Sequence, residues 1–269
     1  MKCVNMYGFD YLLIVIIGIV GFIVQGRLQS VFGKYSQVMF PGGLTGAEVA
    51  EKMLRDNGIH DVKVVSVRGH LTDHYNPTTH TVNLSASVYS SRSVAAAAVA
   101  AHECGHAVQH AVQYAPLKMR SALVPVINIS STWSTWVILI GVLMLNSFPA
   151  IYWVGIAMIA ASALFSLVTL PVEYNASARA LQWLQMSRTL DEQTLPMART
   201  SLRWAARTYL VSALSAVAVL LACDLNDLVE DLANAVNLEH VVNALHYASE
   251  TLKTHTCVDI FVCKLCVVA

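Results

Sequence analysis

The segment His102-Glu103-Cys104-Gly105-His106 holds the densest group of reactive side chains in the sequence. Residues four apart lie on one face of a helix, so His102 and His106 can present their imidazoles to a single metal ion. Glu103 is placed beside them to act on a water molecule as general base rather than as a ligand. The same pattern also arises by chance in Ala-rich helices whose histidines hydrogen-bond within the fold. A metal site would in addition need a third ligand from elsewhere in the chain.

The helix that carries this segment is expected from about Ser93 to Tyr114. Its apolar residues are mainly Ala and Val, and its second half contains Gln109, His110 and Gln113. Ala is only marginally apolar and ionisable groups are costly inside a bilayer, so we expect this helix to pack in a protein core. Cys104 is predicted to face away from the histidines as a small packing residue.

The composition is typical of a membrane protein. Hydrophobic residues make up 56% of the chain and charged residues 13%, against about 25% charged in an ordinary soluble domain. The formal net charge is zero, so the lipid bilayer is an expected partner and nucleic acid is not. The six cysteines define neither a disulfide framework nor a zinc finger.

A first transmembrane helix is predicted over residues 9–26, because residues 11–24 are uncharged and rich in Ile, Leu and Val. Arg27 and Lys34 follow, and positive charges near a span favour the cytoplasmic side. A cleaved secretory signal is the alternative for so short an apolar core, but no small-residue cleavage pattern follows it.

Residues 27–120 are expected to form the first part of a catalytic domain. A helix should begin at Thr45 and end at Asn57-Gly58. Residues 62–67 and 81–84 read as the two strands of a β-hairpin, whose edge can accept an extended peptide by strand addition.

The loop between these strands carries five polar residues with metal-binding or catalytic chemistry, namely His70, Asp73, His74, Tyr75 and His80. Such loops are commonly solvated or hydrogen-bond their own turn, and a second metal site is the alternative. If the loop overhangs the metal, His74 or Tyr75 is the candidate to stabilise the oxyanion of a tetrahedral intermediate.

No Lys, Arg, Asp, Glu or His occurs from Ser121 through Val172, an interval of 52 residues. Two spans need about 20 residues each, so a transmembrane hairpin is predicted over 126–172, with its turn near residues 146–149. A hairpin returns the chain to the side it left. Glu173 is therefore delivered to the membrane face that holds the two histidines.

Glu173 is the predicted third metal ligand, since two His and one Glu form a known ligand set for catalytic zinc. The alternative is an acidic residue that stabilises a helix N-terminus. Pro171 is expected to help start the helix that carries Glu173. On this helix Asn175, Ser177 and Arg179 are candidates to orient the ligands through hydrogen bonds.

The remaining segments are interpreted from composition. Residues 173–207 are expected to form the second part of the catalytic domain, and their arginines place the site in the cytoplasm. A fourth span is predicted over 208–223, although about 24 Å of helix needs flanking residues or local thinning to cross. Residues 224–269 form a tail of unknown role, whose His and Cys residues are too irregularly spaced to define a metal site.

Several motifs together resemble those of a known family. HECGHAVQH, LTDHYNP, TLPVEYNASARAL and the ARTY segment at 206–209 look like the neutral zinc metallopeptidases of the YugP type, membrane proteins distantly similar to the HtpX-like gluzincin proteases. The resemblance runs from about residue 9 to 222. It implies one Zn²⁺ ion per chain, held by His102, His106 and Glu173, with Glu103 as base. HtpX-like proteins usually carry Asp four residues after the glutamate ligand, where this chain has Ser177, so the role of that position cannot be copied.

We therefore expect a mainly α, multi-pass membrane protein with about four transmembrane helices and a zincin-like α+β catalytic domain that contains a small β-hairpin. The predicted function is a zinc metalloendopeptidase of a bacterial cytoplasmic membrane, with its site facing the cytoplasm and membrane-associated proteins or peptides as substrates. One alternative is a zinc-binding membrane scaffold or sensor that cleaves nothing. The other is an intramembrane protease of the site-2 type, although no Leu-Asp-Gly segment supplies the third ligand of that class.

Overall fold

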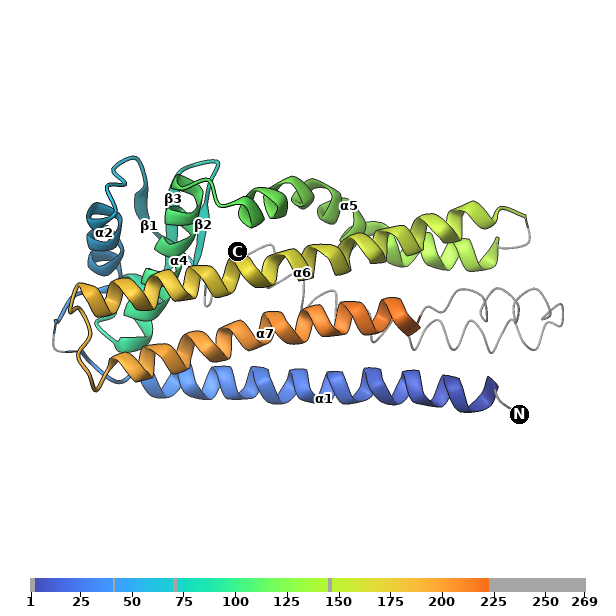
Figure 1. The fold of residues 1–269 in the computed structure, drawn as a ribbon, viewed down its shortest axis with the longest axis horizontal. Helices are drawn as coiled ribbons and strands as arrows, with labels where there is room; N and C mark the ends of the chain where they lie inside the picture. Colours follow the sequence, from blue (N-terminus) through green and yellow to red (C-terminus); the bar gives the residue numbers. More distant parts are fainter. Residues whose placement is uncertain (1–2, 41, 70–71, 145–146, 223–269) are drawn as a thin grey trace. The chain divides into compact units, whose positions relative to one another are not determined.

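The computed structural model describes residues 3–40, 42–69, 72–144 and 147–222 (Figure 1). These residues form seven helices and three short strands, which confirms the mainly α prediction. They divide into two compact units, the first from residues 3–20, 120–167 and 211–222, the second from residues 21–119 and 168–210. The predicted tail and His70 lie outside the described residues.

The second unit begins its polar part with α2 (Gly46–Asp56), which has the expected start and stop. The side chain of Thr45 accepts a hydrogen bond from the backbone N–H of Glu48, and the Glu48 carboxylate accepts one from the backbone N–H of Thr45. This reciprocal pair is a capping box, which satisfies two N–H groups that the helix leaves without a partner. Gly58 follows the C-cap at a φ of +71°, a conformation that glycine adopts without strain.

The small sheet differs from the predicted hairpin. Its strands are β1 (Lys63–Val67), β2 (His74–Asn76) and β3 (Thr81–Ser85), and β3 lies in the centre. β1 pairs with β3 in parallel, whereas β2 pairs with it antiparallel. The hairpin therefore joins β2 to β3, because the Asn76 side chain accepts hydrogen bonds from the backbone N–H groups of Thr78 and Thr79 and so forms the turn.

Helix α4 (Val94–Ala111) follows the short α3 (Ala86–Tyr89) and is the central helix of the second unit. The Ser93 hydroxyl accepts a hydrogen bond from the N–H of Ala96 and caps the helix. Most residues of α4 are buried, so the helix lies in a protein core as predicted. This core contains Val49 and Met53 of α2, Val82 and Leu84 of β3, Ala97, Ala101 and Cys104 of α4, Leu184 of α6 and Leu202 of α7.

Four longer helices complete the described chain: α1 (Cys3–Tyr35), α5 (Ala115–Leu143), α6 (Pro149–Met186) and α7 (Leu195–Ala222) (Figure 1). In the part of the chain that the structure describes, three segments are long and apolar enough to cross a membrane, namely Val15–Tyr35, Ala115–Gly141 and Pro149–Met186. Helix α7 is not among them; it carries three arginines in its N-terminal half and an uncharged C-terminal half. The described residues thus support three of the predicted spans, and the fourth, over 208–223, stays a prediction because it runs beyond the described residues.

The expected role of Pro171 is wrong. It lies inside α6, which continues on both sides of it, so it does not start the helix that carries Glu173. A proline within a helix removes one N–H group, which long apolar helices tolerate when neighbouring groups satisfy the freed carbonyl. Glu173 therefore belongs to the same continuous helix as the predicted second arm of the hairpin.

Within the first unit, α5 and α6 approach closely at two glycines. A Cβ atom added to Gly141 would lie 2.6 Å from Cα of Tyr152, and one added to Gly155 would lie 2.6 Å from Cγ1 of Ile138. Small residues that let helix backbones approach are characteristic of membrane helix packing, where lipid offers no hydrophobic driving force between helices. The predicted transmembrane hairpin is thus a closely packed helix pair.

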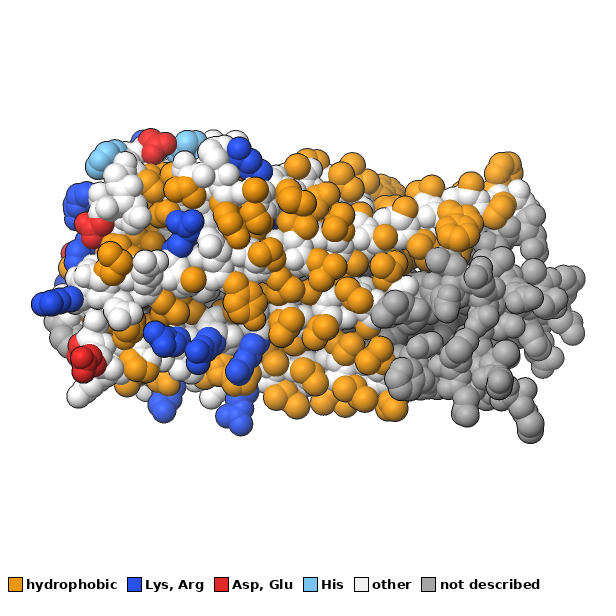
Figure 2. All heavy atoms as spheres, in the orientation of Figure 1, with side chains coloured by type: hydrophobic (Ala, Val, Ile, Leu, Met, Phe, Trp, Pro, Cys, Tyr) orange, Lys and Arg blue, Asp and Glu red, His pale blue; other side chains and the backbone are white. Residues whose placement is uncertain are grey.

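Charge is divided sharply between the two units. Among the Lys and Arg residues that the structure describes, all except Arg120 belong to the second unit. In Figure 2 the Lys and Arg side chains gather on one part of the visible face, and apolar side chains predominate on the remaining surface that is drawn in colour. The first unit is therefore almost free of Lys and Arg, as segments within a bilayer are, and the second carries the positive charge.

Candidate metal centre

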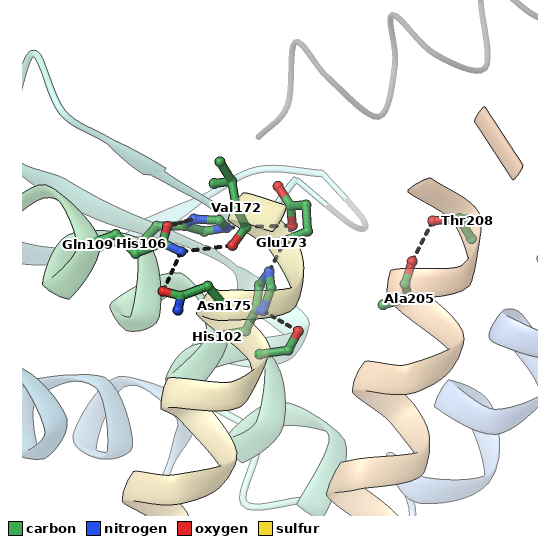
Figure 3. Close-up of polar contacts among 9 residues, drawn as sticks. His102, His106, Gln109, Val172, Glu173, Asn175, Ala205 and Thr208 are labelled. Carbon is green, nitrogen blue, oxygen red and sulfur yellow. Dashed lines mark hydrogen bonds and ion pairs between the residues drawn. The ribbon is translucent and has the colours of Figure 1, made fainter. Parts of the chain in front are cut away.

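Two helices of the second unit bring three ligand-type side chains together (Figure 3). His102 and His106 come from α4 and Glu173 from α6, and one ligand atom of each lies within 4.8 Å of the others. The Glu173 carboxylate oxygen Oε2 lies 3.2 Å from Nε2 of His102 and 3.6 Å from Nε2 of His106. Ligands at about 2.0–2.1 Å from a tetrahedral zinc ion lie about 3.3 Å apart. The donor set fits zinc, and the two distances from Glu173 are close to this separation.

The ligand helices meet at Gly105, inside the metal-binding motif. A Cβ atom added there would lie 2.6 Å from the backbone oxygen of Ala176 in α6. A side chain of any size would therefore push α4 away from the helix that carries Glu173. The sequence offered no sign of this contact, since Gly105 occupies one of the two unspecified positions of the motif.

Gly105→Ala is expected to lower the free energy of unfolding by about 1–3 kcal/mol, because one helix must shift to make room for the methyl group. The zinc content of the purified protein should fall with it, since the shift separates Glu173 from the histidines. Gly26→Ala in α1 is the matched control, because a Cβ atom there has no heavy atom within 4 Å. Thermal unfolding and metal content equal to wild type in Gly105→Ala would show that the contact does not position the site.

The outer nitrogen of each histidine ring has its own partner. Nδ1 of His102 lies 3.1 Å from the Ser177 hydroxyl, and Nδ1 of His106 lies 3.0 Å from Oε1 of Gln109. Both rings therefore direct Nε2 toward Glu173, as two ligands of one metal ion must. Metal-binding histidines are characteristically oriented in this way by a hydrogen bond on the second nitrogen.

Glu103 lies beside this cluster and is not part of it. Its side chain is buried, and the backbone N–H of Tyr75 in β2 is near enough to favour its charged form slightly. Burial raises the pKa of this carboxyl to about 7; His102 opposes the rise, and the negative charges of Glu173 and Asp73 add to it. A carboxyl with a pKa near neutrality can both take and return a proton, which general acid–base chemistry requires.

The two oxyanion candidates have other partners for their side chains. Nδ1 of His74 lies 2.9 Å from the backbone oxygen of Thr72, and Nε2 lies 3.2 Å from the Asn83 amide nitrogen. The Tyr75 hydroxyl lies 3.0 Å from Nδ1 of His110, and burial raises the pKa of Tyr75 to about 12, so it stays protonated. Their role at an oxyanion stays a prediction, and Tyr75 contributes to the site through its backbone.

The rest of the polar loop stabilises the sheet. The Asp73 carboxylate accepts hydrogen bonds from the backbone N–H and the hydroxyl of Ser85, and Nδ1 of His80 lies 2.8 Å from a carboxylate oxygen of Asp61. Among the described residues no second group of His, Cys, Asp and Glu side chains converges as a metal site would. The alternative of a second metal site in this loop gains no support.

The remaining candidates on α6 lie in a hydrogen-bond network behind the ligands. Ser177 contacts His102, as described above, and Arg179 donates from Nε to Oδ1 of Asn175 at 2.8 Å. The same oxygen of Asn175 accepts a bond from Gln109, a residue that sequence reasoning did not place in the site. A polar residue three positions after His106 on the same helix was the signal that could have revealed it.

The geometry agrees with the comparison to known proteins. Residues 10–225 match a family model described as "Putative neutral zinc metallopeptidase". The chain belongs to this family of zinc metallopeptidases. Among its relatives is the Bacillus subtilis (strain 168) protein described as "Putative membrane protease YugP", which is 41% identical over 206 residues, covering 77% of this chain and 90% of the relative. No solved structure matches the chain.

Proposed function

We propose that the protein is a membrane-bound zinc endopeptidase. The observation that carries the proposal is the convergence of His102, His106 and Glu173 from two helices, with the buried carboxyl of Glu103 next to them. Two His and one Glu leave a fourth position open for water, which is the arrangement of a catalytic rather than a structural zinc site.

A zinc ion held by these residues supplies a Lewis acid for the peptide carbonyl and lowers the pKa of the attacking water. Glu103 takes the proton of that water and returns it to the nitrogen of the leaving amine. The nearby backbone N–H of Tyr75 would favour the carboxylate form of Glu103 that takes the proton. Ser177 and Gln109 hold the histidine rings in the orientation that binding requires.

The substrate is a polypeptide that β2 aligns by strand addition. β2 is an edge strand of the sheet, and it also provides the backbone contact to Glu103, so an extended chain added to it would pass the catalytic carboxyl. Membrane-associated substrates are favoured, since three candidate spans hold the chain at a bilayer.

The site faces the cytoplasm in this proposal, because the Lys and Arg residues gather on the unit that carries it. The membrane in this proposal is the bacterial cytoplasmic membrane. We also propose that α7 crosses it, with flanking residues extending the apolar segment to the length that a span needs. The site-2 alternative is less well supported, because α4 is buried among protein side chains and is not a candidate span.

Metal removal tests the proposal directly. Protein purified in detergent without chelator should contain about one zinc ion per chain and should cleave a broad set of unfolded polypeptides. Treatment with 1,10-phenanthroline should abolish cleavage, and added Zn²⁺ should restore it. Protein that carries no zinc under these conditions would refute the proposal, and protein that carries zinc but cleaves nothing would favour the scaffold or sensor.

A further inference from the structure

The buried side chain of Gln109 joins the two helices that carry the metal ligands. It is fully buried on α4. Its Oε1 lies 3.0 Å from Nδ1 of His106, and its Nε2 donates to the backbone oxygen of Val172 at 2.7 Å and to Oδ1 of Asn175 at 3.0 Å. Figure 3 shows the amide between the His106 ring and the turn of α6 that also carries Glu173.

The direction of these bonds is fixed by groups that have only one possible role. The backbone oxygen of Val172 can only accept, so the amide nitrogen of Gln109 must face it. The guanidinium of Arg179 can only donate, so Asn175 presents its oxygen to Arg179 and also to Gln109. Both N–H bonds of the Gln109 amide are used in this way, and Oε1 is left facing His106.

An oxygen acceptor at 3.0 Å requires the proton of neutral His106 to be on Nδ1. The lone pair is then on Nε2, the nitrogen that lies 3.6 Å from Glu173. The opposite tautomer would place a proton where the metal ion binds and would leave Nδ1 facing an oxygen without a hydrogen between them. The hydrogen-bond acceptors of α6 thus fix the orientation of the Gln109 amide, and the amide fixes the tautomer of His106.

We propose that Gln109 is a positioning residue that selects the metal-binding tautomer of His106 and holds α4 in register with the Glu173 turn of α6. The inference rests on the proposed function only in taking zinc as the metal. It requires no peptide cleavage, so metal binding alone can test it.

Gln109→Leu removes the amide and keeps a side chain of similar bulk. We expect its zinc affinity, measured by competition with a chromophoric chelator, to fall by about 10–100-fold. The visible spectrum of the Co²⁺-loaded variant should change as well, because the His106 ring is no longer held. Gln113→Leu is the control, in the turn that follows α4, where the amide is exposed and donates to the backbone oxygen of His110.

Folded Gln109→Leu with the zinc affinity and the Co²⁺ spectrum of wild type would overturn the inference. If this variant does not fold, Asn175→Leu replaces it, since Gln109 is then kept but loses one of its two acceptors. We expect a several-fold weaker affinity and a changed Co²⁺ spectrum, and wild-type values for both would overturn the inference equally. Wild-type protein that binds no zinc would instead refute the proposed function itself.

Discussion

Glu103→Gln is expected to bind zinc as wild type does and to lose about 10²–10⁴-fold in kcat/KM. The amide has the size of the carboxyl, so the site should keep its shape. It cannot take a proton from water. Because Glu103 is not one of the converging ligands, the zinc content should stay at the wild-type level although the activity falls.

The measurement compares cleavage rate and zinc content in the same preparations. Glu51→Gln is a suitable control, because Glu51 is an exposed carboxylate on α2 and its loss should change neither quantity. Comparison of membrane proteomes from cells with wild type or Glu103→Gln would then identify cleavage products. Equal activity of the two proteins would exclude Glu103 as the base and favour a non-catalytic zinc protein.

Glu173→Gln should lose both zinc and activity. The carboxylate is 1% exposed, and its Oε2 is close to the metal-binding nitrogen of both histidines. A neutral amide is a weak zinc ligand, so we expect the affinity to fall by more than the roughly 10–100-fold that loss of an outer hydrogen-bond partner causes. His102→Ala should behave in the same way.

Elemental analysis after dialysis distinguishes this variant from Glu103→Gln, which should keep its metal. Glu192→Gln provides the control, since Glu192 is exposed in the connection between α6 and α7. Stoichiometric zinc in Glu173→Gln would mean that another group supplies the third ligand, and the two-helix site would be wrong.

The parts of the site that could be predicted are those that local sequence determines. The spacing of His102 and His106 places both on one helical face whatever surrounds them. The capping residues Thr45 and Ser93 marked the starts of two helices for the same reason. Glu173 was found through a longer argument, since an uncharged interval of two spans must return the chain to its starting side, and the structure does bring this residue to the histidines.

The parts that could not be predicted depend on tertiary packing. Strand pairing was wrong because residues 62–67 and 81–84 look alike as strands, and only the turn at Asn76 decides which segment forms the hairpin. Pro171 was misread because its effect depends on the helix around it. Gly105 and Gln109 act across the contact between α4 and α6. No residue near them in the sequence indicates that their partners lie about 60–70 residues further on.

The separation of the ligands along the chain has a consequence for biosynthesis. His102 and Glu173 are 71 residues apart, so at about 5–20 residues per second the ribosome needs roughly 4–14 s to deliver the third ligand after the first. The interval between them contains two candidate membrane spans, in α5 and α6, which are largely synthesised before Glu173. A nascent chain therefore carries an incomplete set of metal ligands until both candidate spans have been synthesised, and in the proposed function the centre would form only after the segments that hold it at the membrane.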